Sequence, residues 1–412
     1  LSRGLGDVYK RQDGTKATVI AWLWARTVTC PNPACGIDMP LVRTWWLRKK
    51  KGNEAWIRPI IARDSEHPSG KRVEFEIAEG AAGAPSADGD GTVGRNGAVC
   101  IACGSAVPLE YVRATSQDGG LGARLMSVIA EGDRRRLYVP PSDDHRRAAA
   151  VERCESAPEA LIPEQALGFR VRAYGMTHWA DLFTNRQLLA LTTFSDLVSE
   201  VRQRVLRDAV AAGASAGDRL ESGGSDAEAY ADAVATYLGF VGSKLADWLS
   251  SLCSWISHVE KVRDTFARQA LPMVWDFVEI NPFSNSVGNA SAHFGWITAA
   301  LAYVPQSGPV GTASQQDAAS RSLEGAVIAT DPPYYDNIGY SDLSDFFYVW
   351  LRRSLQDVHP NLLSTMLVPK AEELVANPFR HDGKSGAKQF FEDGFRRVFT
   401  RARECACADY PM

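Results

Sequence analysis

Four of the eight cysteines occur in two close pairs, and each pair is followed at once by a glycine. The pairs and their glycines are Cys30, Cys35 and Gly36, and Cys100, Cys103 and Gly104. A zinc knuckle requires this arrangement, in which two thiolates lie on a tight turn and a glycine relieves the backbone. Two such turns predict one tetrahedral site with four cysteine ligands. The alternative is four buried free thiols, although isolated cysteines do not usually fall into paired turns that end in glycine.

The other titratable metal ligands show no comparable spacing. Four cysteines remain, which we interpret as unligated: Cys154, Cys253, Cys405 and Cys407. The seven histidines are scattered, so they suggest no second metal site. Because four thiolates leave no open coordination position, the predicted zinc would be structural rather than catalytic.

A second unusual group is the run Asp331, Pro332, Pro333 and Tyr334, which follows a short apolar stretch at 326–329. The apolar stretch predicts a buried strand. The prolines fix their own backbone and favour an extended residue before them, so the Asp331 and Tyr334 side chains would be held in a set direction. Ligands bind at the carboxyl ends of strands in open α/β sheets. We therefore treat this segment as a candidate site, with a strand cap followed by a proline turn as the alternative.

The rest of the chain predicts the elements that would position these residues. Strand-like segments are expected at 17–29, on both sides of a basic turn within 41–61, and before a loop within 269–289. Residues 80–98 predict a loop, and residues 122–141 a helix, a basic turn and a short strand. Helices are expected at 184–213, with Thr184 as the cap, and at 226–256, 341–357 and 387–404. Parallel-type strands alternating with helices indicate an α/β core, interrupted by a metal-bearing insert.

The chain ends suggest how the sequence is divided. Residues 1–12, "LSRGLGDVYKRQ", resemble translated adapter sequence, so we interpret them as a non-native leader and both ends as cuts of a fragment. The remaining segments are a strand with the zinc-ribbon insert at 13–150, a helical segment at 151–265 and a catalytic part at 266–412.

Composition limits the classes of protein to consider. Apolar residues make up 45% of the 412 residues, and the net charge is −4, so a nucleic-acid partner would have to meet a local basic patch. No apolar run is long enough to span a membrane, and no secretory pattern opens the chain. Close cysteine pairs fit a reduced compartment, and we expect the cytoplasm.

The motifs together resemble the zinc-ribbon-containing adenine-specific DNA methylase family. The resemblance rests on both cysteine pairs and on four stretches: "VIAWLWARTVTCPNPACG", "DLFTNRQLLALTTFSDLV", "TFARQALPMVWDFVEINPFS" and "DPPYYDNIGYSDLSDFFYVWL". It covers most of residues 17–412. It implies a partial Rossmann-like methyltransferase core, the methyl donor S-adenosylmethionine, and double-stranded DNA with a flipped adenine as the partner. Restriction-modification or phage defence is the setting that the family suggests.

The chemistry of amine methylation explains the residue types in this motif. The exocyclic amine of a base is a poor nucleophile, and two acceptors that pull on its hydrogens, the Asp331 carboxylate and the Pro332 carbonyl, would activate it. Tyr334 offers a face on which a flipped base can stack. The family's glycine-rich cofactor turn does not occur after residue 12, and the resemblance places it upstream of the cysteines. Asn281 and Phe283 are candidate cofactor contacts, with a structural turn as the alternative.

A cluster of basic and aromatic residues in the insert is a candidate DNA surface. Its members are Arg43, Arg48, Lys49, Lys50, Lys51 and Arg58, beside Trp45, Trp46 and Trp56, with Arg134 to Arg136 as an extension. The alternative is a solvated hairpin tip. At the level of the whole protein, the alternatives are an RNA base methyltransferase and a non-catalytic zinc-ribbon nucleic-acid-binding protein.

Overall fold

The computed structural model describes residues 8–10, 16–133, 135–304, 308, 311–321, 326–336 and 338–407. Most of the expected leader lies outside these residues. Its one described part, the backbone of β1 (Val8–Lys10), pairs antiparallel with the start of β2 (Lys16–Thr29). Because almost any sequence can form such backbone pairing, it does not test the interpretation of residues 1–12 as a leader.

The main sheet is built around the long strand β2. Its neighbours are β10 (Gly122–Ala130) on one edge and both β3 (Asp38–Leu41) and β14 (Asp276–Ile280) on the other, and β11 (Leu137–Val139) follows beyond β10. β2 is buried on both faces, and its side chains alternate between two cores. Trp22 and Trp24 face one core, where the Trp24 ring stacks on Phe277 at 6.4 Å, whereas Leu23 and Ala25 face the other.

Two expectations about this sheet are wrong. The described ladders between strands are all antiparallel, not parallel. The segment expected to form a helix, within residues 122–141, begins with strand β10 instead. Its Leu, Met and Ala residues favour a helix locally, but pairing with β2 about a hundred residues earlier overrides that preference. A Rossmann-like sheet is not evident among the described residues, and that part of the fold remains a prediction.

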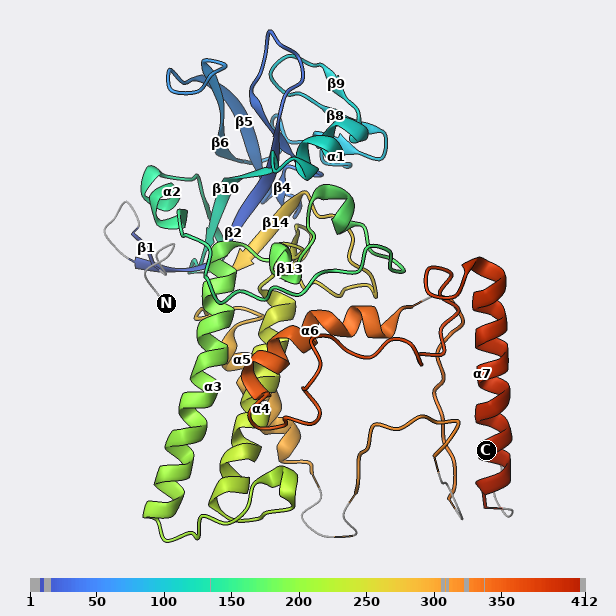
Figure 1. The fold of residues 1–412 in the computed structure, drawn as a ribbon. Coiled ribbons are helices and arrows are strands. Elements are labelled where there is room, and N and C mark those ends of the chain that lie inside the picture. The colour runs from blue at the N-terminus through green and yellow to red at the C-terminus, as the bar shows by residue number, and fades with distance from the viewer. Residues whose placement is uncertain are drawn as a thin grey trace.

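The insert forms one end of the molecule, above the main sheet in Figure 1. It contains two three-stranded sheets and a helix: β4 (Trp46–Arg48), β5 (Ala55–Arg63) and β6 (Lys71–Glu79), then β7 (Val93–Gly94), β8 (Gly97–Val99) and β9 (Ala106–Val107), then α1 (Leu109–Gln117). The strands on both sides of the basic turn are confirmed as β4 and β5. The expected loop over 80–98 is mostly irregular but includes β7 and the start of β8.

Below the sheet lies a layer of helices. Its members are α3 (Asn185–Ala211), α4 (Ala227–Trp248), α5 (Ala290–Leu301) and α6 (Tyr340–Leu355). The expected cap of α3 is confirmed: the Gln187 amide nitrogen donates to the Thr184 hydroxyl at 3.3 Å, and the Thr184 amide nitrogen donates to the Gln187 side chain at 2.9 Å. Gly239 lets α6 approach α4, because a Cβ there would lie 2.6 Å from a methyl carbon of Leu355.

The remaining described elements are short. They are α2 (Asp143–Ala149), β12 (Ser254–Ile256), β13 (Lys261–Arg263) and three 3-10 turns at Val171–Tyr174, Trp179–Leu182 and Leu220–Ser222. The three segments expected from the sequence share one core, and two of them share the main sheet, since β14 of 266–412 pairs with β2 of 13–150. A buried ion pair from Arg186 of α3 to Glu279 of β14, with Nε to Oε2 at 2.9 Å, joins the helical segment to that sheet.

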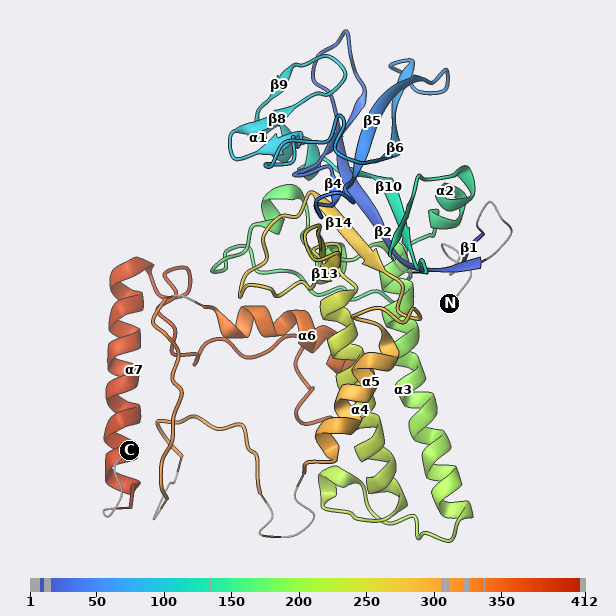
Figure 2. The same cartoon turned by 180° about the vertical axis from the view of Figure 1, so that it is seen from behind.

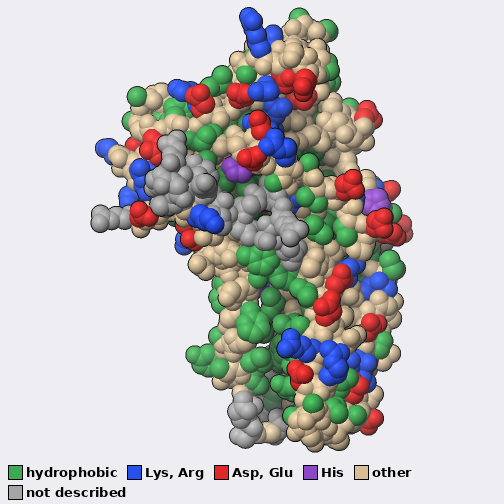
Figure 3. Space-filling view, turned by 90° about the vertical axis from the view of Figure 1, so that its left-hand side faces the viewer, with side chains coloured by type: hydrophobic (Ala, Val, Ile, Leu, Met, Phe, Trp, Pro, Cys, Tyr) green, Lys and Arg blue, Asp and Glu red, His purple; other side chains and the backbone are tan. Residues whose placement is uncertain are grey.

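The last helix, α7 (Gly383–Cys405), stands apart from the other helices in both ribbon views (Figures 1 and 2). An extended stretch that includes residues 326–334 runs beside it. Hydrophobic side chains also gather on the lower half of the face in Figure 3, where the helical layer lies.

Candidate metal centre and candidate catalytic segment

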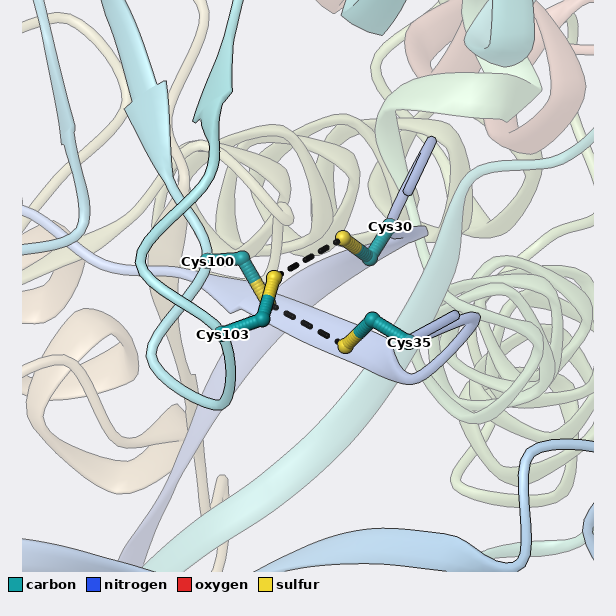
Figure 4. Close-up of side chains that lie close together, drawn as sticks. All are labelled: Cys30, Cys35, Cys100 and Cys103. Atoms are coloured by element: carbon teal, nitrogen blue, oxygen red, sulfur yellow. Dashed lines mark hydrogen bonds between the residues drawn. The ribbon is translucent and has the colours of Figure 1, made fainter. Parts of the chain in front are cut away.

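The four paired cysteines come from two tight turns that face each other (Figure 4). Cys30 follows β2 directly, and its amide nitrogen donates to the Ile37 carbonyl at 2.8 Å across the first turn. Cys100 follows β8 directly, and its carbonyl accepts from the Gly104 amide nitrogen at 2.8 Å. Gly36 and Gly104 adopt φ of +55° and +73°, a region that side-chain-bearing residues rarely occupy. The sequence therefore places a glycine at the position where each turn needs one.

The four sulfur atoms lie within 4.8 Å of one another. The Sγ atoms of Cys30 and Cys103 are 3.7 Å apart, and those of Cys35 and Cys100 are 3.8 Å apart. A tetrahedral zinc ion with Zn–S bonds of about 2.3 Å sets its sulfurs about 3.8 Å apart. The cluster could therefore hold a metal ion, and its donor set and sulfur spacing are consistent with zinc.

The surroundings of the sulfurs differ. Cys30, Cys35 and Cys100 are buried and Cys103 is exposed. Burial raises the pKa of the Cys30 thiol to about 12, whereas hydrogen bonds with Ser105 lower the pKa of Cys103 to about 6. A divalent cation would offset the cost of holding several thiolates together in this partly buried site, because it favours the deprotonated form of its ligands. Among the His, Cys, Asp and Glu side chains of the described residues, this cluster of four cysteines has the spacing of a metal site.

The Asp331–Tyr334 segment lies on the surface and in an extended conformation. Asp331 and Tyr334 are exposed, and the Tyr334 hydroxyl donates to Asp331 Oδ1 at 2.8 Å. This hydrogen bond to a carboxylate raises the pKa of Tyr334 above its usual value of 10. The two side chains expected to act together are therefore adjacent.

The expectation of a buried strand at 326–329 is wrong. These residues form no ladder, and Val327 is 65% exposed. Ala326 alone makes a bridge, to Ala406, where its carbonyl accepts from the Cys407 amide nitrogen at 3.0 Å. The local preference for a strand is present, but among the described residues no strand pairs with it.

Asn281 and Phe283 lie in the turn after β14. Asn281 is buried, and its side chain donates to the Val19 carbonyl at 2.8 Å and accepts from the Phe283 amide nitrogen at 3.0 Å. Those bonds commit the Asn281 side chain to the turn, which favours the structural interpretation. Phe283 is half exposed beside Phe194. No recorded contact joins either residue to the Asp331–Tyr334 segment or to the cysteines.

The expectation that exposed tryptophans interleave with the basic residues of the insert is wrong. Trp45, Trp46 and Trp56 are all buried. Arg48 is 1% exposed and lies 3.8 Å from carboxylates of both Glu79 and Glu260, so it is not available to phosphate. Other members are also committed, since Arg58 pairs with Glu76, Arg135 lies 3.6 Å from Glu79, and the Arg136 guanidinium lies over the Trp255 ring. Arg134 lies outside the described residues. Four of the basic residues, Arg43, Lys49, Lys50 and Lys51, remain exposed, so their contact with DNA stays a prediction.

Sequence reasoning missed a buried charged cluster that begins a few residues after the Asp331–Tyr334 segment. Arg380 lies 2.6 Å from the Asp342 carboxylate and 2.8 Å from that of Glu373. The Glu373 carboxylate also accepts from the Ser341 amide nitrogen at 2.9 Å, at the start of α6. The Tyr335 carbonyl accepts from the Ala376 amide nitrogen at 3.0 Å. The cluster therefore ties the chain on both sides of residue 338 to the segment 373–380. Acidic residues among the aromatics of "YSDLSDFF" were its sequence signal.

Arg380→Met is expected to destabilise the protein by about 3–5 kcal/mol, because it leaves the Asp342 carboxylate, which is 1% exposed, without its cation. Urea unfolding followed by tryptophan fluorescence measures this loss. Arg204→Met is the matched control, since Arg204 and its partner Asp208 are largely exposed, and it should cost at most about 1 kcal/mol. Equal unfolding midpoints for the two variants would contradict the assignment.

Comparisons with models of protein families, with curated proteins and with solved structures found no match to this chain. The resemblance to the methylase family therefore rests on its sequence motifs alone. Among the described residues, none of the helices combines the length and apolar character needed to cross a bilayer.

Proposed function

We propose that this protein is an S-adenosylmethionine-dependent methyltransferase that modifies the exocyclic amine of adenine in DNA. The observation that supports it best is the Asp331–Tyr334 segment. A carboxylate, two prolines and an aromatic ring lie together, and among the described residues the carboxylate accepts a hydrogen bond from the tyrosine hydroxyl. A substrate amine could replace that hydroxyl as the donor to Asp331.

The roles of the residues follow from amine chemistry. S-adenosylmethionine supplies an activated methyl group, so no covalent enzyme intermediate is needed. The Asp331 carboxylate and the Pro332 carbonyl accept the two amine hydrogens, which leaves the nitrogen lone pair free to attack. Tyr334 is 55% exposed, so its ring can cover the face of a base that has left the duplex. The Asn281 side chain is bonded within its own turn, so the cofactor contacts are proposed to come from the glycine-rich turn that the resemblance implies.

The four-cysteine site is proposed to hold a structural zinc ion. Four protein ligands complete its tetrahedron, which leaves no position for water or substrate. Double-stranded DNA with a flipped adenine is the proposed partner, the cytoplasm the proposed location, and restriction-modification or phage defence the proposed setting.

The test is methyl transfer from tritiated S-adenosylmethionine by the polypeptide extended upstream to include the cofactor turn. Duplex DNA and tRNA are offered in separate reactions, and mass spectrometry identifies the modified base. N6-methyladenine in DNA supports the proposal. Methylation of tRNA but not DNA would instead assign the protein to the RNA base methyltransferases. Methylation of neither substrate would contradict the proposed methyltransferase activity.

A further inference from the structure

α7 carries a row of aromatic rings beside the catalytic segment. Phe391, Phe395 and Phe399 recur every four residues, and successive ring centroids lie 4.6 and 5.5 Å apart. The same three rings line a surface groove together with Pro332 and Pro333. The groove therefore begins at the residues that follow Asp331.

The packing of α7 leaves Phe399 exposed and Phe391 and Phe395 half-buried. Gly394 faces the Leu374 side chain so closely that a Cβ would lie 2.2 Å from it, and Ala402 and Cys405 are buried on the same part of the helix. The aromatic row lies next to that buried side, and Phe399 at its far end is 41% exposed. Figures 1 and 2 show α7 away from the helical layer, with an extended stretch of the described chain beside it.

The charge of α7 is opposite to that of the chain. Its 23 residues contain six Lys and Arg and three Asp and Glu, whereas the whole chain has a net charge of −4. Arg396 and Glu392 both line the groove, and the Arg396 guanidinium donates to the Asp393 carboxylate at 2.7 Å. Arg403, which is exposed, continues the row one turn after Phe399. Stacking faces bordered by cationic side chains are the combination that holds unpaired nucleotides, because bases stack on the rings while phosphates meet the charges.

We infer that this groove binds a short single-stranded stretch of nucleic acid next to the methylation target. Bases lie against the aromatic row, and a phosphate meets the exposed Arg403. The inference extends the proposed function and rests on it for the identity of the neighbouring target base. It concerns binding alone and involves no chemical step.

The test is fluorescence anisotropy of a labelled 12-nucleotide DNA single strand titrated with the chain, without methyl donor. Phe399→Ala should weaken binding about 5- to 150-fold, the range for loss of one base stack. Phe399→Tyr should restore affinity, because the ring face remains. Tyr303→Ala is the matched control: Tyr303 is 88% exposed beyond α5, and its loss should leave affinity unchanged. Circular dichroism melting verifies that each variant is folded.

Charge is tested separately through salt. Arg403→Gln should reduce the magnitude of the slope of log K against log salt by about 0.7, as expected for one phosphate contact on a single strand. An unchanged slope together with unchanged Phe399→Ala affinity would overturn the inference, as would the absence of binding by the unmodified chain. If Phe399→Ala instead converts a dimer to a monomer and leaves oligonucleotide affinity unaltered, the row is a self-association surface and the inference is also overturned.

The failure of this inference and that of the proposed function have different signatures. Because the titration contains no methyl donor, oligonucleotide binding can be confirmed even when methyl transfer to DNA and tRNA is absent. The converse result is a Phe399→Ala enzyme that keeps both full methyl-transfer activity and normal oligonucleotide affinity. That result would contradict nucleotide binding in the groove and leave the proposed methyltransferase activity supported.

Discussion

Removal of metal from the four-cysteine site is expected to unfold residues 28–110 locally, while the β2–β10–β14 sheet and the helical layer remain folded. Binding of a structural zinc ion is coupled to folding, and in zinc-finger peptides it contributes about 10–16 kcal/mol. The second cysteine turn lies among short strands, since β7, β8 and β9 are only two or three residues long, whereas the ladder between β2 and β3 closes the first. By contrast, β2 keeps long ladders with β10 and β14.

The measurement combines metal analysis with limited proteolysis. Purified protein should contain about one zinc per chain, and Cys100→Ser should reduce this sharply. Chelation should make the insert sensitive to protease. Cys154→Ser is the matched control, because Cys154 is half-buried and bonds with Ser156 and Thr192 rather than with the cluster. Metal-free protein whose insert resists protease as well as the loaded form does would refute a structural role.

The parts of the fold that the sequence predicted correctly depend on local chemistry. A thiolate pair followed by glycine specifies its own turn, and the Thr184 capping box satisfies backbone groups within one turn of helix. The later helices were likewise found near their observed positions, as α4, α6 and α7. In each case the residues that decide the structure lie within a few positions of one another.

The incorrect predictions concern segments whose structure is decided by residues that are distant in the sequence. Residues 122–130 form a strand because β2 offers a ladder, and Arg48 is buried because Glu79 and Glu260 approach it from distant segments. The tryptophans of the insert looked like a binding surface, but their burial depends on strands paired later in the chain. The apolar stretch at 326–329 is the opposite case. Its residues favour a strand locally, but none of the described strands forms a ladder with it.

Asp331→Ala is expected to reduce methyl transfer to adenine by about a hundredfold or more, because it removes one of the two acceptors that activate the amine. The structure makes this substitution informative. The Asp331 side chain is exposed and, within the described part of the chain, accepts a hydrogen bond from the Tyr334 hydroxyl, so the change should leave the fold intact. Cofactor binding should also remain, because the proposal assigns those contacts to the upstream turn. Tritium incorporation into duplex DNA by the extended polypeptide measures the rate, and calorimetry measures cofactor affinity.

The neighbouring tyrosine supplies the matched controls. Tyr334→Phe keeps the ring face and frees Asp331 Oδ1 from its hydroxyl partner, so activity should fall little. Tyr334→Ala removes the stacking face, which contributes roughly 1–3 kcal/mol per base, and should weaken both base binding and rate. The mechanism therefore predicts an order of methyl-transfer rates. Tyr334→Phe should be closest to the parent enzyme, Tyr334→Ala slower, and Asp331→Ala slowest. Near-normal turnover by the Asp331→Ala enzyme would show that the carboxylate does not act on the amine.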